Sequence, residues 1–235
     1  VLHEVWKVDS EIDVNLIEKS FEKVDCLYIA DGHHRAAASS RARKQLMEKN
    51  RSHNGSEEYN FVMGAIFPDD ELRILDYNRV VKELNGMDSN EFLQKIEENF
   101  TVSCACESPY SPKELHEIGM YLDKKWYSLK AKDHIISKTD AVKALDVSIL
   151  QEYLLSPVLG IENPRKDPNI YFLGGIRGVR ALEDWIDDKN WKVAFSMYPT
   201  QLSQLIQVAD DGMIMPPKST WFEPKLRSGL TIHKI

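Results

Sequence analysis

Alternating and helically spaced apolar residues divide the start of the chain into short elements. Leu2–Val8 alternates in the manner of a strand, and Asp13–Lys23 carries apolar residues near helical spacing, with Asp13 in position to cap that helix. Cys26–Ala30 is typical of a buried strand. After a turn, Arg35–Lys49 is rich in residues that favour helices. The pattern therefore predicts a strand, a helix, a strand and a helix within residues 1–50.

Beyond residue 50 the pattern mixes hairpins with helices. Strand-like runs flank turns at Pro68–Asp70 and Asp123–Lys125, and both predict antiparallel hairpins. Ser111–Glu114 has the form of a capping box with proline at the first helical position, and Leu145–Ile161 predicts a buried helix that Pro157 stops. This order predicts an α+β (mixed α/β) fold class with a largely antiparallel sheet and helices. The other predicted elements are helices over 89–99, 178–188 and from Thr200, and strands over 101–107, 169–175, 191–198 and 230–235.

The bulk composition excludes several classes of protein. The chain has 235 residues, 43% of them hydrophobic, which is enough for a sizeable core. A net charge of −7 counts against nucleic acid as a partner, because that partner usually requires a basic surface. No apolar run approaches the roughly 20 residues that span a membrane, and no signal peptide is recognisable. We therefore expect a cytoplasmic protein with no nucleic-acid or membrane partner; the sequence indicates no oligomeric state.

Three cysteines bear on the compartment and on metal binding. A low, odd number of cysteines is typical of a reducing compartment. Cys104 and Cys106 alternate on one predicted strand face, and no second cysteine pair completes a metal site with them. Packing is the favoured interpretation of that pair, and we predict no resident metal ion.

The run DGHHR, Asp31–Arg35, combines residues suited to an anion. Gly32 allows a sharp bend, and a helix that begins there directs free N–H groups and its positive dipole end at the bend, as phosphate requires. Arg35 adds a planar fork for phosphate, and His33 and His34 add donors that change charge near neutral pH. Asp31 could cap the helix, hold a metal ion that bridges phosphates, or orient a histidine. The run therefore predicts a phosphate-binding turn.

Two alternatives remain open for the same turn. Asp31 could be a plain helix cap with the histidines in solvent, since such turns are common. Asp31, His33 and His34 could instead form a metal centre, but adjacent histidines at a helix start point in different directions and are poor partners for one ion.

The C-terminal segment MPPKSTWFEPKLRSGL is a second candidate. Lys218 and Lys225 supply point charges, while Ser219 and Thr220 supply hydroxyl groups, and prolines stiffen the segment. Together they could line a phosphate or carboxylate pocket that faces the DGHHR turn. The alternative is an ordered C-terminal strand with exposed lysines.

Two further motifs carry weaker signals. Arg79 follows a predicted strand and is expected to form a structural ion pair with Asp76, or else to reach the site. The run FLGGIRG, with Gly174 and Gly175 before a helix, is similar to a phosphate loop but lacks the Walker spacing and its lysine.

The ADGHHR motif resembles a widespread group, the domain-of-unknown-function family ten-fifteen. The segments Asp76–Gly86, Leu145–Ile161 and Met215–Leu230 resemble shared blocks of the same family, so the resemblance covers essentially the whole chain. Members are typically longer at the N-terminus, and this chain, which begins at Val1, is expected to be their C-terminal part. The activity of the family is largely uncharacterised.

The segment Val5–Lys44 also resembles the ParB/sulfiredoxin-like fold, in which a strand, a helix, a strand and a Gly-x-x-Arg helix start bind nucleotide phosphates. ParB proteins read Gly-Glu-Arg-Arg there and bind cytidine triphosphate. Sulfiredoxins read Gly-Cys-His-Arg, and His33 in place of that cysteine excludes their thiol chemistry. Related free-serine kinases read Asp-Gly-His-Thr-Arg. Asp31, Gly32, His33 and Arg35 match that version, while His34 replaces the threonine.

The kinases use an earlier glutamate as general base, and no position in this chain matches it by motif. Glu4 and Asp9 are the acids near the first predicted strand, so the base would otherwise lie upstream of Val1. This departure counts against catalysis by the chain alone and leaves phosphate binding standing.

The resemblance implies a nucleotide-dependent kinase of a small hydroxyl metabolite, with free serine as the leading substrate. ATP or ADP and Mg²⁺ are the implied cofactors, and the implied partners are the nucleotide and a small-molecule substrate. Residues 1–50 would form a ParB/sulfiredoxin-like nucleotide-phosphate-binding unit, and residues 51–235 a family-specific part that packs back on it. The alternatives are a non-catalytic nucleotide-binding switch and a metal-dependent hydrolase. Asp31 and His33 would act in catalysis, and the nucleotide or phosphate would bind Gly32, His34, Arg35, Lys218, Ser219, Thr220 and Lys225.

Overall fold

A computed structural model describes residues 2–105, 109–227 and 229–235, and it divides the chain into two compact units. The N-terminal unit is Val1–Val62 together with Ile235, and the sheet unit is Met63–Lys234. The fold class is α+β, as the order of elements predicted. Cys106, part of the cysteine pair considered above, lies outside the described residues.

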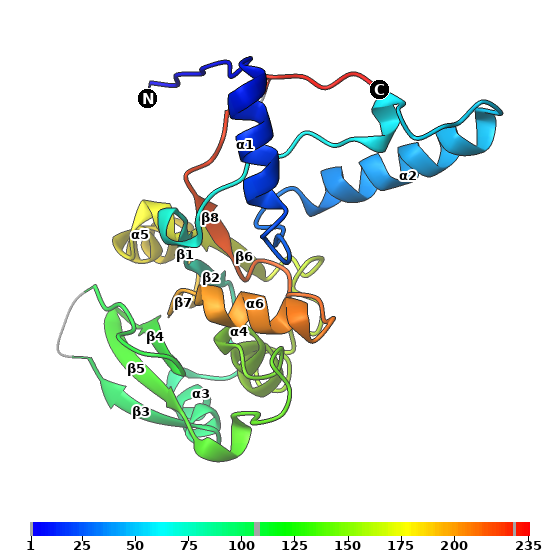
Figure 1. Cartoon of the computed structure of the whole chain (residues 1–235). Helices are drawn as coiled ribbons and strands as arrows, with labels where there is room; N and C mark the ends of the chain where they lie inside the picture. The colour runs from blue at the N-terminus through cyan, green and yellow to red at the C-terminus, as the bar shows by residue number, and fades with distance from the viewer. Residues whose placement is uncertain (1, 106–108, 228) are drawn as a thin grey trace. The chain divides into compact units, whose positions relative to one another are not determined.

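The N-terminal unit contains two α-helices among its described residues (Figure 1). α1 (Glu11–Phe21) begins at Ser10, whose hydroxyl accepts the Asp13 N–H at 3.4 Å, so the prediction of Asp13 as the cap was wrong. α2 (His33–Lys49) begins two residues earlier than predicted, and a 3₁₀ turn, η1 (Glu58–Asn60), follows it. The predicted boundary at residue 50 comes directly after the end of α2.

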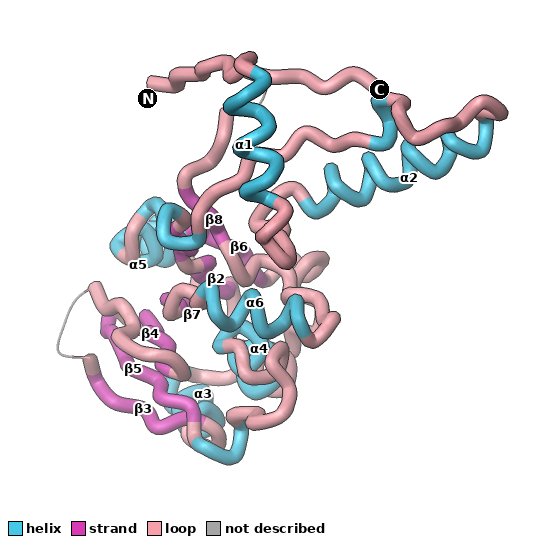
Figure 2. Tube along the Cα trace, in the orientation of Figure 1, coloured by secondary structure: helices cyan, strands magenta, loops and turns pink. Residues whose placement is uncertain are grey.

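The two strands predicted in the N-terminal unit do not form. Leu2–Val8 and Cys26–Ala30 are loop, as Figure 2 shows. Their apolar side chains are exposed, for example Leu2 at 81%, and none of the described residues in this unit is buried. A strand requires a neighbour to accept its backbone hydrogen bonds, and the described part of this unit offers no paired strand. The alternating pattern therefore identified the apolar residues correctly, but it could not show whether a second strand would pair with them.

The sheet unit is built on antiparallel strands. Among the residues that the structure describes, the main sheet has six strands in the order β3-β5-β4-β7-β2-β6, and β1 and β8 form a separate pair. The strands are β1 (Arg73–Leu75), β2 (Tyr77–Val81), β3 (Phe100–Cys104), β4 (Glu117–Leu122), β5 (Lys125–Ala131), β6 (Ile170–Gly174), β7 (Val193–Met197) and β8 (Trp221–Glu223).

Helices and short turns connect these strands. α3 begins at a capping box, in which the side chains of Asp88 and Glu91 accept the N–H groups of Asp88, Asn90 and Glu91. The elements are η2 (Asp69–Glu71), α3 (Ser89–Ile96), η3 (Asp133–Ile135), α4 (Asp146–Leu150), the π-helical η4 (Gln151–Leu155), η5 (Gly175–Arg177), α5 (Arg180–Lys189) and α6 (Leu202–Asp210).

One predicted hairpin is confirmed and the other was wrong. β4 and β5 pair across Asp123 and Lys124, which both have positive φ, as a tight two-residue turn requires. The hairpin over Pro68–Asp70 does not form, because β1 pairs with β8, a strand far away in the sequence. The predicted strand over 230–235 is loop.

The capping box predicted at Ser111–Glu114 starts no helix. The side chain that satisfies this backbone comes instead from β4, where the Glu117 carboxylate accepts the Lys113 N–H at 2.7 Å. The same carboxylate accepts the hydroxyls of Tyr110 and Ser128. The carboxylate of Glu117 on β4 therefore takes the place of the capping side chain that the sequence pattern predicted within Ser111–Glu114.

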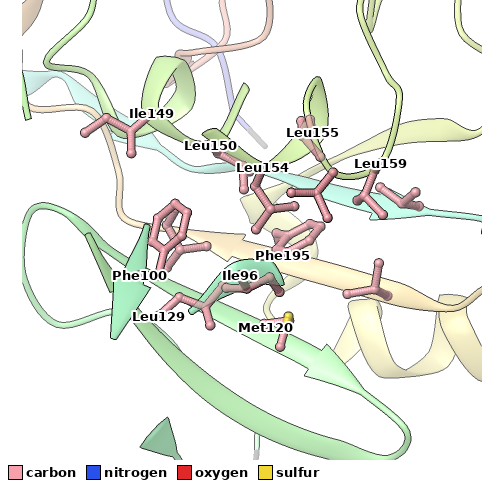
Figure 3. Close-up of a cluster of buried hydrophobic side chains, with 14 of the residues drawn as sticks. Ile96, Phe100, Met120, Leu129, Ile149, Leu150, Leu154, Leu155, Leu159 and Phe195 are labelled. Carbon is pink, nitrogen blue, oxygen red and sulfur yellow. The ribbon is translucent and has the colours of Figure 1, made fainter. Parts of the chain in front are cut away.

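The main core lies where α4 and η4 cover one face of the sheet. Leu145–Ile161 was predicted to be a buried helix, and its leucines are buried among side chains of the strands and α3. Phe195 of β7 is 0% exposed and lies at the centre of this cluster. Figure 3 shows the cluster, including Ile96, Met120, Leu129, Ile149, Leu150, Leu154 and Leu155.

His116, the residue before β4, pairs with Asp146, the buried first residue of α4. The Asp146 carboxylate accepts the backbone N–H of His116 at 3.0 Å, and its Oδ1 lies 2.9 Å from His116 Nδ1. The hydrogen bond to Asp146 raises the pKa of His116, against the opposing effect of burial. Protonated His116 therefore stabilises the fold.

This pair predicts a pH-dependent free energy of unfolding. Because the folded-state pKa is raised, the contribution of His116 is fully present below its unfolded pKa of about 6.5 and is lost as pH rises through the folded pKa. His116→Asn should remove this dependence, and asparagine suits the positive φ of 66° at this position. Urea unfolding between pH 5.5 and 8.5 measures it, with His134→Asn as the control. An unchanged pH slope in His116→Asn would contradict the assignment.

Candidate functional site

The DGHHR turn places a glycine at the start of α2. Gly32 is the N-cap, with φ 85° and ψ 23°. This left-handed conformation is unfavourable for residues that have a side chain. The Ala36 N–H donates to the Gly32 carbonyl at 2.9 Å and forms the first helical bond. The Asp31 carboxylate accepts the Gly32 N–H at 2.7 Å. The alternative of Asp31 as a plain helix cap stays a prediction.

The side chain of Arg35 folds back over this glycine. Its Nη2 lies 2.9 Å, and its Nε 3.1 Å, from the position that a Cβ on Gly32 would occupy. His33, His34 and Arg35 are exposed, and the first turn of α2 contains no acidic residue. The positive end of a 17-residue helix thus lies next to a guanidinium at the surface of this unit. An anion suits this position.

In the sheet unit, two lysines of the C-terminal segment lie over aromatic rings. Lys218 Nζ is 5.1 Å from the ring centre of Tyr77, and Lys225 Nζ is 5.9 Å from that of Trp221. The two rings are themselves in contact, with centroids 5.3 Å apart. The Trp221 indole N–H donates to Glu223 Oε1 at 2.7 Å. Cation–π contacts therefore hold both ammonium groups at the start of β2 and along β8.

Ser219 and Thr220, the predicted hydroxyl ligands, have different surroundings. Ser219 is buried, its hydroxyl donates to the Pro216 carbonyl at 2.8 Å, and its own carbonyl accepts the Thr200 hydroxyl at 3.0 Å. These bonds fix the segment before β8. Thr220 is half-buried beside β8. Their role as phosphate ligands, and a pocket shared with the DGHHR turn, stay predictions, since each unit is described by itself.

The first two glycines of FLGGIRG, Gly174 and Gly175, are required by packing. A Cβ on Gly174 would lie 2.3 Å from Trp221, and one on Gly175 would lie 2.0 Å from an Asp76 carboxylate oxygen. The Gly175 N–H donates to the Asp76 carbonyl at 2.8 Å, so it does not face a ligand. The interpretation of this run as a loose phosphate loop was therefore wrong at this glycine.

Arg79 is a functional candidate whose surroundings could not be predicted correctly from the sequence. It is 3% exposed, and its guanidinium donates to the carbonyls of Tyr77 and Lys218 and lies 5.4 Å from the centre of the Phe172 ring. Among the described residues no carboxylate lies within ion-pairing distance of it, so the predicted ion pair with Asp76 is not formed.

The charges of these two residues still influence each other. Burial lowers the pKa of Arg79 to about 10, and the Asp76 charge opposes that shift. Burial raises the pKa of Asp76, although its own N–H, Asn78 and Arg79 lower it in part. One feature of the sequence could have indicated the buried Arg79: the polar pair Asn78 and Arg79 at the start of an apolar strand.

In residues 2–105, 109–227 and 229–235, no three His, Cys, Asp or Glu side chains gather as a metal site. Within the same residues, no helix is long and apolar enough to cross a membrane.

Comparison with known proteins gives one family match. A model of the family described as "Protein of unknown function (DUF1015)" matches residues 1–148. No curated protein matches the chain.

Solved structures match only distantly. A free serine kinase in complex with AMP has a TM-score of 0.43 and 12% identity, over 92% of this chain and 81% of that one. A mutant free serine kinase in complex with ADP has a TM-score of 0.39 and 15% identity. The match covers 66% of this chain and 55% of that kinase, so this chain spans about half the length of the kinase. A conserved hypothetical protein from Pyrococcus furiosus has a TM-score of 0.43 and 11% identity, over 83% of this chain and 68% of that one. At these values the matches carry no inference about activity.

Proposed function

The chain belongs to the DUF1015 family, and we propose that it is a nucleotide-dependent kinase of a small hydroxyl metabolite, with free serine as the leading substrate. The observation that supports this proposal best is the start of α2. There, a helix N-terminus, a left-handed glycine and the Arg35 guanidinium lie together in an Asp-Gly-His-x-Arg sequence. Each of these features favours a phosphate group.

Each residue of the turn has a proposed role. The N–H groups after Gly32 bind a phosphate of ATP or ADP, and the Arg35 fork stabilises charge on the transferring group. His33 faces the reacting atoms, and His34 donates to a phosphate oxygen. Asp31, whose carboxylate already bonds to the Gly32 N–H, orients the hydroxyl substrate or would hold a bridging Mg²⁺.

The C-terminal residues remain part of the proposal. Lys218 and Lys225 are exposed cations that would add charge near a phosphate, with Ser219 and Thr220 beside them. In the sheet unit itself, the rings of Tyr77 and Trp221 hold the lysines. Lys218→Ala and Lys225→Ala test their part separately in the assay below.

The proposal predicts a product that is simple to detect. Full-length protein incubated with ATP or ADP, Mg²⁺ and L-serine should yield phosphoserine, measured by ³¹P NMR and mass spectrometry. Omitting nucleotide or serine is the control and should give none. Absence of phosphoserine with either nucleotide would overturn the kinase proposal. Tight nucleotide binding without turnover would instead favour a nucleotide-binding switch.

A further inference from the structure

A small pocket in the sheet unit meets the buried side of Arg79. Its volume is about 40 Å³, and five separate parts of the chain line it. Val147, Gln151 and Leu155 come from α4 and η4, and Pro216 and Pro217 come from the segment before β8. Phe172 of β6 and Pro164 complete the wall, so Arg79 and Gln151 are its polar members.

The register of the sheet explains why a cation lies here. Arg79 is paired across β2 with Phe172 on one side and Phe195 on the other, so its side chain lies on the face that α4 and η4 cover. A guanidinium on a covered face is costly unless it is hydrogen-bonded and balanced by negative charge.

The protein satisfies this guanidinium only in part. Arg79 has five N–H donors, and its bonds to the Tyr77 and Lys218 carbonyls use two of them. Those partners are neutral, and within the described residues no carboxylate lies at ion-pairing distance, so the charge of Asp76 acts on Arg79 only from beyond that distance. Lys218, which supplies one carbonyl, has φ 58°, an unfavourable conformation for a residue with a side chain.

We propose that this pocket binds the carboxylate of a small aliphatic acid. The carboxylate accepts N–H groups of Arg79 and its short apolar body lies against Val147, Leu155 and the prolines. Gln151 donates one amide N–H to the Ile161 carbonyl at 2.7 Å, and its second N–H is the additional donor for the ligand.

Charge and size favour a carboxylate over a phosphate. The pocket offers one cation, which balances a single negative charge, and the rest of its wall is mostly apolar. Its volume of about 40 Å³ exceeds the roughly 10–15 Å³ that one water needs, and it suits a group of a few heavy atoms. The π-helical turn Gln151–Leu155 forms one wall, and such turns occur frequently at functional sites.

The proposal is tested with propionate as the probe, using the full chain. In isothermal titration or saturation-transfer NMR, propionate should bind at least about 10-fold more tightly than propionamide, its neutral isostere, because a charged hydrogen bond is worth more than a neutral one. Inorganic phosphate should bind more weakly than propionate. Equal affinity for propionate and propionamide, no binding of propionate, or a preference for phosphate would each overturn the proposal.

Two variants locate the binding. Arg79→Lys keeps the charge and loses the fork, but it also removes bonds that hold β2 to Lys218 and so tests folding as well. Val147→Ile leaves Arg79 intact and adds one methylene to the pocket wall, and it should weaken propionate binding at least about 10-fold in a protein that circular dichroism shows to be folded. Val102→Ile on β3, the same change outside the pocket, should bind as the wild type does. Unchanged binding in Val147→Ile would overturn the site. Because the propionate experiments contain no nucleotide, a negative result in them would leave the kinase proposal unaffected.

Discussion

Replacing Phe195 with alanine should lower the free energy of unfolding of the sheet unit by about 3–5 kcal/mol. Phe195 is 0% exposed on β7, which lies between β4 and β2, and it belongs to the cluster that includes Leu150 and Leu154 (Figure 3). Truncation removes apolar contacts and leaves a cavity in a part of the sheet that strands on both sides hold in place. Urea unfolding followed by tryptophan fluorescence measures the loss.

Ile214→Ala is the matched control for this experiment. Ile214 is in the same unit and is 86% exposed, so its truncation should change the free energy of unfolding by no more than about 0.5 kcal/mol. A loss of about 3–5 kcal/mol is a large share of the 5–15 kcal/mol that stabilises a typical domain. Similar losses in the two variants would show that Phe195 does not occupy the core.

Elements with local signals could be predicted from the sequence. The turn between β4 and β5 has charged residues between two apolar runs, and the buried helix that starts at Asp146 is a long apolar segment ended by Pro157. Both signals lie within the element itself. Sheet partners gave no such signal, because β1 pairs with β8 across most of the sheet unit. Nothing in Arg73–Leu75 specifies Trp221–Glu223 as its neighbour.

The N-terminal unit shows the limit of periodicity in another way. Alternating apolar residues over Leu2–Val8 predicted a strand, yet they are exposed loop in the structure. The pattern reports which side chains would share one face if a strand formed. Whether it forms depends on a paired edge and an apolar surface, and neither is encoded in the segment itself.

The DGHHR turn and Arg79 also differ in how much of their structure is determined by neighbouring residues in the sequence. The glycine in DGHHR predicted a sharp bend at a helix start because the requirement is local, and Gly32 is there in a left-handed conformation. The position of Arg35 over Gly32 required coordinates, since a flexible side chain has many rotamers. Arg79 was assigned to an ion pair because Asp76 is near it in sequence. Its burial follows from its register with Phe172 and Phe195, which belong to other strands.

Replacing Arg35 with alanine should weaken nucleotide binding about 10- to 100-fold under the proposed function. Hydrogen bonds to a charged group contribute roughly 1.5–3 kcal/mol, and Arg35 supplies the guanidinium at the start of α2. The melting temperature should not fall, because the side chain is exposed and a cation is unfavourable at a helix N-terminus. Isothermal titration with ATP and ADP measures the affinity, and thermal unfolding measures the stability.

Two further variants distinguish a phosphate fork from simple positive charge. Arg41→Ala removes an exposed arginine from the same helix, away from the turn, and should leave nucleotide affinity unchanged. Arg35→Lys keeps the charge and loses the planar pair of donors, so its affinity should lie between those of the wild type and Arg35→Ala. If Arg41→Ala weakened binding as much as Arg35→Ala, the whole helix would attract nucleotide through net charge alone. If neither change mattered, phosphate would bind elsewhere and the roles assigned to Gly32 and Arg35 would fail together, because both depend on an anion at the N-terminus of α2.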